Sequence, residues 1–347
     1  MLASVLRAAG YRVGLYTSPH LVSFCERMRV DGVAASEAAV AAWVARLEEP
    51  AVRHEASFFE ITTAVAFADL AARGAEIAVV EVGLGGRLDA TNVLTPLAAG
   101  VTRIALEHTD YLGPDLASIA REKAGIAKPG VPFVTTEPDD AVAGVLESEA
   151  RARGARFERV DPSYGAGLAL GLAGSHQTAN AALALRLAEL LGSRFPVDEV
   201  AIRGGLASAR LPGRFDRRGR WLFDAAHNPD GIRALAAALR ASPPPRPVVA
   251  VVSILSDKAW PEMLGILATF ADVVLLTRAP SAPPDRAWSL DEAESWARSA
   301  GIAVMVEPDF DRALAMAGSR AATALVTGSF HTVGDAMARL PGVAPLG

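Results

Sequence analysis

Three residues able to bind a metal ion, Ser18, Glu81 and His108, each lie at or near the end of an apolar segment typical of a buried strand. The carboxyl ends of parallel strands meet at one edge of a sheet, where ligands of open α/β folds gather. Hydroxyl and carboxylate oxygens suit magnesium, whereas imidazole is a less usual ligand for it. Each residue alone could be a solvated loop residue, and only their expected convergence predicts a metal site.

Glu81 opens a glycine-rich turn that raises the question of a phosphate-binding loop. The turn contains Gly83, Gly85 and Gly86, but the 347 residues contain no Gly-Lys dipeptide, which a Walker loop requires. The dinucleotide-binding pattern fails as well, because its third glycine would stand at Leu88. The turn is therefore predicted to position an acid and not to bind phosphate. For an isolated acid, pairing with an arginine would be the simplest interpretation.

Composition excludes several classes of protein. The net charge is −5, with 34 Lys+Arg against 39 Asp+Glu, so we expect no nucleic-acid partner. The single cysteine, Cys25, rules out an internal disulfide framework and fits a reducing compartment. No apolar run approaches the roughly 20 residues that span a bilayer, and the first residues do not resemble a signal peptide. We therefore expect a cytoplasmic protein with no membrane partner.

Apolar strand-like segments alternate with helical segments along most of the chain, which predicts an α/β fold with a mostly parallel sheet covered on both faces. The basic segment ARLPGRFDRRGR interrupts this alternation with Pro212, Gly213 and Gly219. We predict a first domain over residues 1–210, a linker over 211–219 and a smaller second domain over 220–347.

Eight short motifs occur in order across both predicted domains: YTSPHL, FFE, EVGLGGRLDATN, HTDYLG, REKAGI, LPGRF, DAAHNPDG and GSFHTV. Together they closely resemble the folylpolyglutamate synthase/dihydrofolate synthase family of the Mur ligase superfamily. The resemblance implies a P-loop-NTPase-like ATP-binding domain followed by a smaller Rossmann-like domain that binds glutamate. It also implies a monomer that uses ATP and two Mg²⁺ ions to join L-glutamate to dihydropteroate, or to the γ-carboxylate of a folate, through an acyl phosphate.

The resemblance also assigns roles to matching positions. It implies that Ser18 binds the first magnesium ion, that Glu81 and His108 bind the second, and that Lys123 is carbamylated and supports the metal cluster. Lys123, Asp224 and His227 are the implied catalytic residues. The implied nucleotide contacts are Asn180, Arg214 and Asp224; the implied pterin-side contacts are Phe59, Glu60, Leu88 and Asp89; and the implied glutamate contacts are Asp224, His227 and Ser329.

Simpler structural roles are available for several of these residues. Lys123 could be a solvated helix residue, His227 and Asn228 could cap the following helix, and Phe59 could belong to the core. A peptidoglycan-type ligase acting on a UDP-linked substrate is an alternative within the superfamily, but YTSPHL together with EVGLGGRLDATN favours folate. A nicotinamide dehydrogenase is disfavoured because no dinucleotide pattern is present.

One family feature is missing from the sequence. The family's phosphate loop, of the type T-x-G-K-[GST], is expected just before the helix that here begins at Met1. Two explanations compete: an N-terminally truncated form of a working enzyme, and a binding or regulatory remnant without the loop. Because the other polar site residues are retained, truncation is favoured. We then expect the 347 residues to bind ATP poorly and to turn over slowly or not at all.

Overall fold

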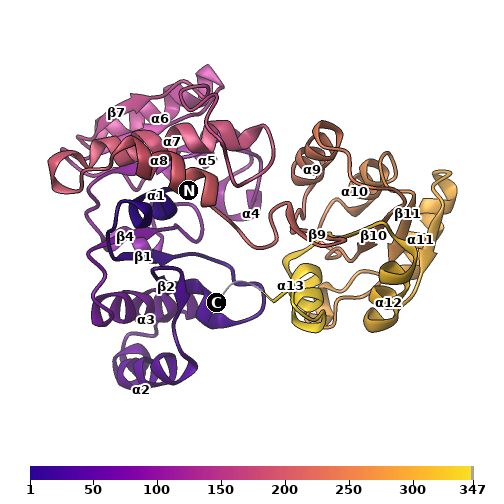
Figure 1. The fold of residues 1–347 in the computed structure, drawn as a ribbon. Helices are drawn as coiled ribbons and strands as arrows, with labels where there is room; N and C mark the ends of the chain where they lie inside the picture. Colours follow the sequence, from indigo (N-terminus) through magenta and orange to yellow (C-terminus); the bar gives the residue numbers. More distant parts are fainter. Residues whose placement is uncertain (345–347) are drawn as a thin grey trace.

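The computed structural model describes residues 1–344, in which the strands form three sheets (Figure 1). Two sheets belong to an N-terminal region, residues 1–208, and the third belongs to a C-terminal region, residues 216–344. The two regions lie side by side in Figure 1, joined by the segment between α8 and β8.

The strands and helices of the N-terminal region follow the predicted alternation with a few additions. The strands are β1 (Val13–Tyr16), β2 (Met28–Val30), β3 (Val33–Ala34), β4 (Ile77–Val80), β5 (Ala99–Val101), β6 (Pro132–Thr135) and β7 (Arg156–Arg159). The helices are α1 (Leu2–Ala8), α2 (Glu37–Arg53), α3 (Phe58–Ala72), α4 (Thr109–Leu112), α5 (Leu116–Ala124), α6 (Asp140–Ala152), α7 (His176–Leu190) and α8 (Glu199–Ser208).

The N-terminal strands do not form the single sheet that was predicted. β3, β2, β1 and β4 make one sheet, in which β1 and β4 are parallel and the β1–β2 and β2–β3 pairs are antiparallel. β5, β6 and β7 make a separate parallel sheet. Asp31 and Gly32 both have positive φ and connect β2 to β3, so an Asp-Gly turn signals a hairpin that the sequence analysis missed.

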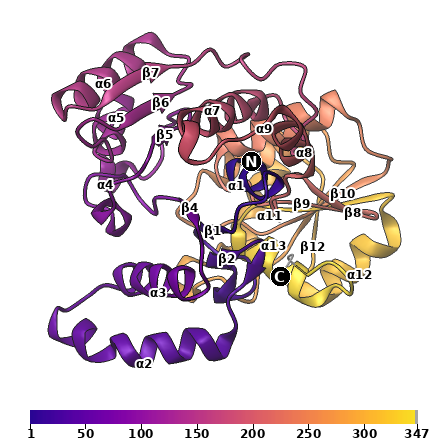
Figure 2. The ribbon, with the colours of Figure 1, turned by 60° about the vertical axis from the view of Figure 1, so that its left-hand side comes forward.

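Helices hold the two N-terminal sheets together. Within residues 1–344 no strand ladder joins β4 to β5, and Figure 2 shows the two strands apart from one another. Helix α1 packs against β1 and β4 and also against α7 and α8, while α7 packs against β5 and β6. A Cβ on Gly205 of α8 would lie 2.4 Å from the Cα of Val5 in α1, so glycine permits a backbone-to-backbone approach there.

The C-terminal region contains one sheet in the order β12-β11-β10-β13-β9-β8, parallel except for the edge strand β8. Its strands are β8 (Asp216–Arg218), β9 (Trp221–Asp224), β10 (Val248–Val252), β11 (Val273–Leu276), β12 (Val304–Val306) and β13 (Thr323–Thr327). Its helices are α9 (Pro229–Ala241), α10 (Trp260–Leu267), α11 (Leu290–Ser299), α12 (Phe310–Arg320) and α13 (Phe330–Arg339).

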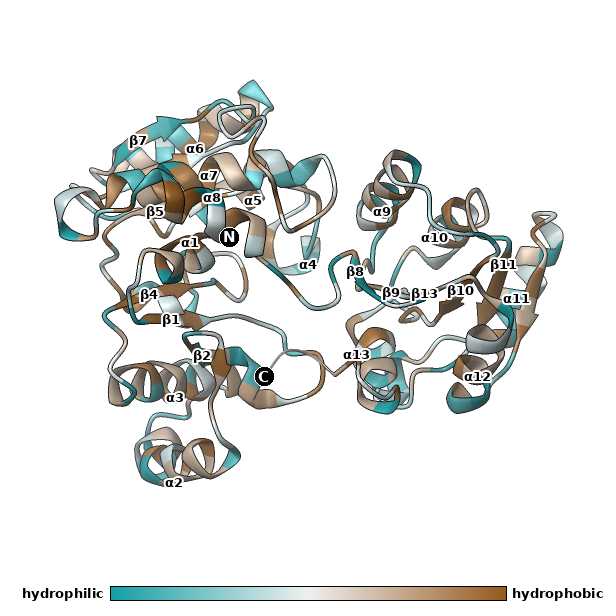
Figure 3. Cartoon of the chain, viewed as in Figure 1, coloured by the Kyte–Doolittle hydropathy of each residue, from teal (hydrophilic) through white to brown (hydrophobic). Residues whose placement is uncertain are grey.

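The C-terminal sheet has an apolar core on each face. Residues of α9, α10 and α11 pack on one face, and residues of α12 and α13 pack on the other. All residues of the central strands β10 and β13 are buried, and Figure 3 shows these strands as hydrophobic. The edge strand β8 lies inside the segment 211–219 that was predicted as a linker. An ion pair between Arg218 and Asp216 accompanies this strand.

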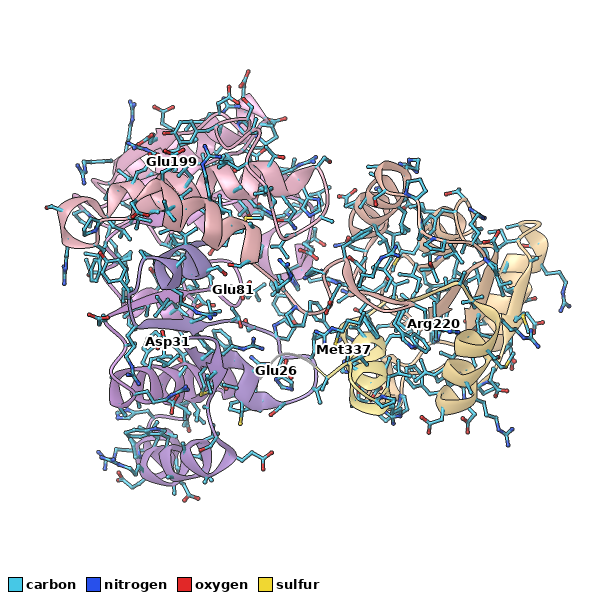
Figure 4. All side chains as sticks on the ribbon, in the orientation of Figure 1. Glu26, Asp31, Glu81, Glu199, Arg220 and Met337 are labelled. Atoms are coloured by element: carbon cyan, nitrogen blue, oxygen red, sulfur yellow. The ribbon has the colours of Figure 1, made fainter. Side chains whose placement is uncertain are left out.

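The loop after β1 contacts the C-terminal region directly. Leu21 packs against the core cluster that includes Met337, and a Cβ on Gly334 of α13 would lie 2.1 Å from the carbonyl oxygen of Leu21. The carboxylate of Glu26 accepts a hydrogen bond from the backbone N–H of Leu21 and so supports this loop. Figure 4 labels Glu26 and Met337 on the two sides of the boundary.

Across residues 1–344, no helix is both long and apolar enough to cross a membrane.

Candidate active site

Ser18 and Glu81 meet beyond the carboxyl ends of two neighbouring strands. β1 and β4 run in parallel with Tyr16 opposite Val80, so the residues that follow these strands share one edge of the sheet. The backbone N–H of Ser18 donates to Oε2 of Glu81 over 3.0 Å. The structure therefore brings together the first two of the three predicted metal ligands.

Glu81 is exposed to solvent, but neighbouring atoms partly desolvate its carboxylate, and no cation lies beside it within residues 1–344. This desolvation raises its pKa, while the hydrogen bond from Ser18 and the more distant charge of Arg214 oppose that rise. No arginine pairs with it directly in the part of the chain that the structure describes, which leaves the simplest prediction for an isolated acid unmet. A partly desolvated carboxylate costs free energy unless a cation compensates for its charge, so this accessible position suits a bound cation.

Asp89 holds the glycine turn in its shape. One carboxylate oxygen accepts from the backbone N–H groups of Gly83 and Leu84, each over 3.0 Å. The other accepts from the backbone N–H of Thr91 over 2.9 Å and from its hydroxyl over 2.6 Å. With both oxygens engaged in this way, Asp89 positions the turn beside Glu81.

The glycines allow the turn to pack closely against its neighbours. A Cβ on Gly83 would lie 2.3 Å from the ring of Phe59, and one on Gly86 would lie 2.8 Å from the carbonyl oxygen of Glu122 in α5. The backbone N–H of Arg87 donates to that same carbonyl oxygen over 2.9 Å. In the structure the glycines therefore permit close packing of the turn against α5 and Phe59.

His108, the third predicted ligand, follows β5 and therefore belongs to the other N-terminal sheet. It has φ of 54°, a strained conformation for a non-glycine residue, and it is the N-cap of α4. Burial lowers its pKa, whereas the neighbouring Glu107 acts in the opposite direction. No cluster of three or more His, Cys, Asp or Glu side chains is arranged for a metal within residues 1–344. Ser18 and Glu81 thus form one half of the predicted site, and His108 comes from across the divided sheet.

Lys123 lies in the last turn of α5, which packs against the glycine turn. Burial lowers the pKa of its amine, and the charge of Glu107 partly opposes this. The simpler interpretation of Lys123 as a solvated surface residue therefore does not fit its position. A lysine with a lowered pKa contains more of the neutral amine, which is the form that reacts with carbon dioxide.

Glu107, which the sequence analysis did not select, connects the two regions. Its Oε1 accepts from Nε2 of His227 over 3.1 Å and from Nδ2 of Asn228 over 2.8 Å. The hydrogen bond from His227 is the main cause of its low pKa, about 2. An acid directly before His108 was the available sequence signal, but its partners lie 120 and 121 residues away. Asn228 also caps α9, so its predicted capping role coexists with this bridge.

Arg214 and Asp224 lie together at the start of the C-terminal region. Asp224 accepts from the backbone N–H groups of Phe215 and Ala226 over 2.9 and 3.0 Å. Burial raises the pKa of its carboxyl group, and these hydrogen bonds and Arg214 oppose the rise. The guanidinium of Arg214 lies 5.1 Å from the ring centroid of Phe330, a cation–π contact that orients it.

A cavity between α7 and the C-terminal region is lined by His176, Gln177, Arg214 and Asp224, among others. Asn180, the predicted nucleotide contact on α7, donates from Nδ2 to Oε1 of Gln177 over 3.0 Å. Gln177 in turn lies 3.1 Å from Nε2 of His176. The sequence analysis missed both cavity-lining residues, and their only signal was their place on the same helix as Asn180.

The remaining predicted residues differ in solvent exposure and in whether their side chains already have partners within the protein. Leu88 is 80% exposed, which is unusual for a large apolar side chain, whereas Phe59 packs against the core around Tyr16. Glu60 accepts from the backbone N–H and the hydroxyl of Ser57 at the start of α3. Ser329 is only 3% exposed and caps α13 through the backbone N–H of Thr332. Their roles toward substrates stay predictions.

Comparison with known proteins places this site in a class of ligases. Residues 213–330 match the family model described as Mur ligase, glutamate ligase domain. The chain is 38% identical over 354 residues to the dihydrofolate synthase/folylpolyglutamate synthase of Escherichia coli (strain K12). This alignment covers 97% of this chain and 82% of that protein. It is 32% identical to the corresponding Bacillus subtilis (strain 168) protein, covering 79% of this chain and 71% of the relative.

Solved structures agree with this assignment. The structure of E. coli FolC in complex with DHPP and ADP matches with a TM-score of 0.85 and 35% identity, covering 97% of this chain and 84% of that one. A Yersinia pestis c092 folylpolyglutamate synthase/dihydrofolate synthase complexed with AMPPNP and Mn ion matches with a TM-score of 0.81 and 35% identity, with the same coverage. The chain belongs to the dihydrofolate synthase/folylpolyglutamate synthase family, whose members are ATP-dependent ligases.

Proposed function

We propose that this protein joins L-glutamate to dihydropteroate, to the γ-carboxylate of a tetrahydrofolate, or to both, with cleavage of ATP to ADP and phosphate. The observation that carries the proposal is the contact of Glu107, beside His108 in one region, with His227 and Asn228 in the other. Relatives that bind DHPP, ADP or AMPPNP support the choice of substrates.

The chemistry requires two successive transfers. An oxygen of the acceptor carboxylate attacks the γ-phosphorus of ATP, and ADP leaves with the bridging oxygen. The glutamate amine then attacks the resulting acyl phosphate, losing a proton as phosphate leaves. Arg214 is suited to neutralise charge that develops on the phosphoryl oxygens. A site between two regions lets their closure exclude water, which would otherwise hydrolyse the acyl phosphate.

Magnesium would supply further charge neutralisation during phosphoryl transfer. The hydroxyl of Ser18 and the carboxylate of Glu81 form a donor set that suits this ion, and we propose that His108 completes the second of two sites. We propose that Lys123 reacts as the neutral amine with carbon dioxide, releasing a proton and forming a carbamate that supports the metal ions. Its lowered pKa supports that modification.

We propose nucleotide contacts for Asn180, Arg214 and Asp224, together with His176 and Gln177, because the last two line the cavity that Arg214 and Asp224 also line. For the pterin side we propose Phe59, Glu60 and Leu88, with Asp89 acting through the turn that it holds. We propose that His227 and Asp224 contact glutamate and that Ser329 shapes that site as a helix cap. We further propose that the protein acts as a monomer.

We also propose that tight ATP binding needs a phosphate-binding strand and loop that the 347 residues do not contain. Two observations support this idea: the absence of a Gly-Lys dipeptide and the divided N-terminal sheet. In residues 1–344, β4 pairs only with β1 and β5 pairs only with β6, so each has one edge without a ladder. A strand between them would make the sheet continuous, and the 347 residues alone would bind ATP weakly.

The test uses two proteins: the 347-residue chain, and a chimera in which the segment of the E. coli relative that precedes the matched region is joined before Met1. We expect glutamylated product, detected by mass spectrometry, from the chimera with ATP and at least one of the two acceptors, and little from the 347-residue chain. A folded chimera that binds ATP but glutamylates neither acceptor would contradict the proposed reaction. Rapid ligation by the 347-residue chain would contradict the need for the added loop.

A further inference from the structure

Arg27 is a buried arginine at the boundary between the two regions. It is the last residue of a short 3₁₀ helix, Phe24–Arg27, and is 8% exposed. The guanidinium carbon lies 5.7 Å from the ring centroid of Phe24 and 5.8 Å from that of Phe58. Its Nε donates to Nδ1 of His20 over 2.9 Å. Two aromatic rings and one imidazole therefore hold the guanidinium in place.

No carboxylate pairs with Arg27 within the part of the chain that the structure describes. The nearest acid in sequence, Glu26, is engaged elsewhere. Its carboxylate accepts from the backbone N–H groups of Leu21, Val22 and Ser23 over 2.7 to 3.0 Å. Burial lowers the pKa of Arg27, although an arginine stays charged at neutral pH. The result is a buried positive charge without an internal counter-ion, which is costly in the unliganded protein.

The residues around Arg27 include a neighbour of each proposed substrate position. Phe58 precedes Phe59 on α3, the pterin side of the proposed site. Burial, Arg27 and, from the C-terminal region, His331 of α13 all lower the pKa of His20. His331 is two residues beyond Ser329, the predicted glutamate-side residue.

Arg27 and His20 together offer several free donors. Nδ1 of His20 accepts a hydrogen bond, so in the neutral ring the proton is on Nε2, which can donate. The Nη1 and Nη2 groups of Arg27 have no hydrogen-bond acceptor within residues 1–344, and neither group is completely buried. A planar pair of such groups matches the two oxygens of a carboxylate.

We propose that Arg27 binds a carboxylate of one of the two substrates, either the acceptor carboxylate or a carboxylate of the incoming glutamate. This inference rests on the proposed function and adds a binding residue to it. A ligand carboxylate would supply the missing counter-ion, and the flanking rings of Phe24 and Phe58 would exclude water from the pair. Arg27 would then help to hold a substrate at the boundary where both regions contact it.

The test is calorimetric binding to the 347-residue protein, performed separately with dihydropteroate and with L-glutamate. Wild type is compared with Arg27→Gln, Arg27→Lys and the control Arg29→Gln. Arg29 lies two residues away and donates from Nε to the backbone carbonyl of Glu26, so its side chain is already engaged. We expect Arg27→Gln to weaken binding of one ligand by about 10- to 100-fold, as expected for loss of a charge-assisted pair. Arg27→Lys should weaken it less, and Arg29→Gln should leave it unchanged.

The two ligands distinguish the source of the carboxylate. Weaker dihydropteroate binding with normal glutamate binding assigns the acceptor carboxylate, and the reverse assigns a glutamate carboxylate. If both Arg27 variants are folded by circular dichroism and bind both ligands as wild type does, the proposal is wrong. If Arg27→Gln does not fold, Arg27→Lys decides, and wild-type affinity for both ligands in that variant overturns the proposal. If wild type binds neither ligand, the proposed function fails first, and the role of Arg27 fails with it.

Discussion

The two regions of this chain assemble their sheets in different ways. In the C-terminal region the strands β8 to β13 form one continuous sheet, and the central strands β10 and β13 are completely buried. In the N-terminal region the strands form two sheets, so helices α1, α7 and α8 must hold the halves together. The acids Glu81 and Glu107 come from the two halves of this divided region. The comparison teaches that helix packing, more than strand pairing, maintains the geometry of the N-terminal half of the site.

The largest expected effect tests that dependence on helices. Gly205→Ala would place a Cβ 2.4 Å from the Cα of Val5 and force α8 away from α1. We expect the free energy of unfolding to fall by about 3 kcal/mol, measured by urea denaturation. Gly204→Ala is a matched control on the same helix, because its Cβ would meet nothing within 4 Å. The control should gain about 0.5–1 kcal/mol. Equal effects of the two substitutions would show that α1–α8 packing does not limit stability.

The second prediction concerns a cation bound in the N-terminal region, whose strands form two sheets. If Glu81 binds a metal, Mn²⁺ at 100 times its dissociation constant should raise the free energy of unfolding by about 2.7 kcal/mol. Glu81→Gln should abolish this increase, because a neutral amide cannot replace the carboxylate as an anionic ligand. Denaturation with and without Mn²⁺ measures both values. An equal Mn²⁺ effect in wild type and variant would place the cation elsewhere.

A smaller effect is expected from Glu81 in the absence of metal. Desolvation raises its pKa in the folded protein, so ionisation above the ordinary carboxyl pKa favours the unfolded chain, and stability falls as pH rises through that range. Glu81→Gln removes this penalty while it keeps an acceptor for the N–H of Ser18. Because Glu81 is exposed and solvent screens its charge, we expect only a small stabilisation of the metal-free protein at neutral pH, below about 0.5 kcal/mol. A destabilised variant would mean that the charge is already compensated.

Glu107 should behave in the opposite way, because it has partners in the C-terminal region. Its pKa is about 2 in the folded protein, below the ordinary 4.5, so its contribution is complete above pH 4.5 and is lost as pH falls toward 2. At neutral pH, Glu107→Gln should cost about 0.5–1 kcal/mol, a small value because the side chain is 41% exposed and solvent screens the pair. Denaturation at several pH values tests this. A variant that keeps the wild-type acid sensitivity would show that the bridge is not responsible.

Local sequence was sufficient to predict most of the alternating strands and helices, and it placed Glu81 at the end of a strand in an α/β fold. It was also sufficient to exclude the glycine turn as a phosphate loop, since the absence of Gly-Lys needs no structure. Residue order brought Ser18 and Glu81 to one sheet edge because parallel strands place their carboxyl ends together. The family resemblance then followed from motifs in order, and the comparisons confirm the family.

Only the tertiary structure decided which polar groups meet from distant parts of the chain. Glu107 lies 120 residues from His227, and no local pattern predicts that hydrogen bond. Nor does the sequence reveal that the Asp89 carboxylate accepts hydrogen bonds from backbone N–H groups. It also does not reveal that Arg27 is buried without a carboxylate partner in the described residues. Strand periodicity depends on neighbours in the chain, whereas pairing and burial of charges depend on how separate elements pack. That difference is why the sequence predicted the elements and the family, and the structure was needed for the electrostatics of the site.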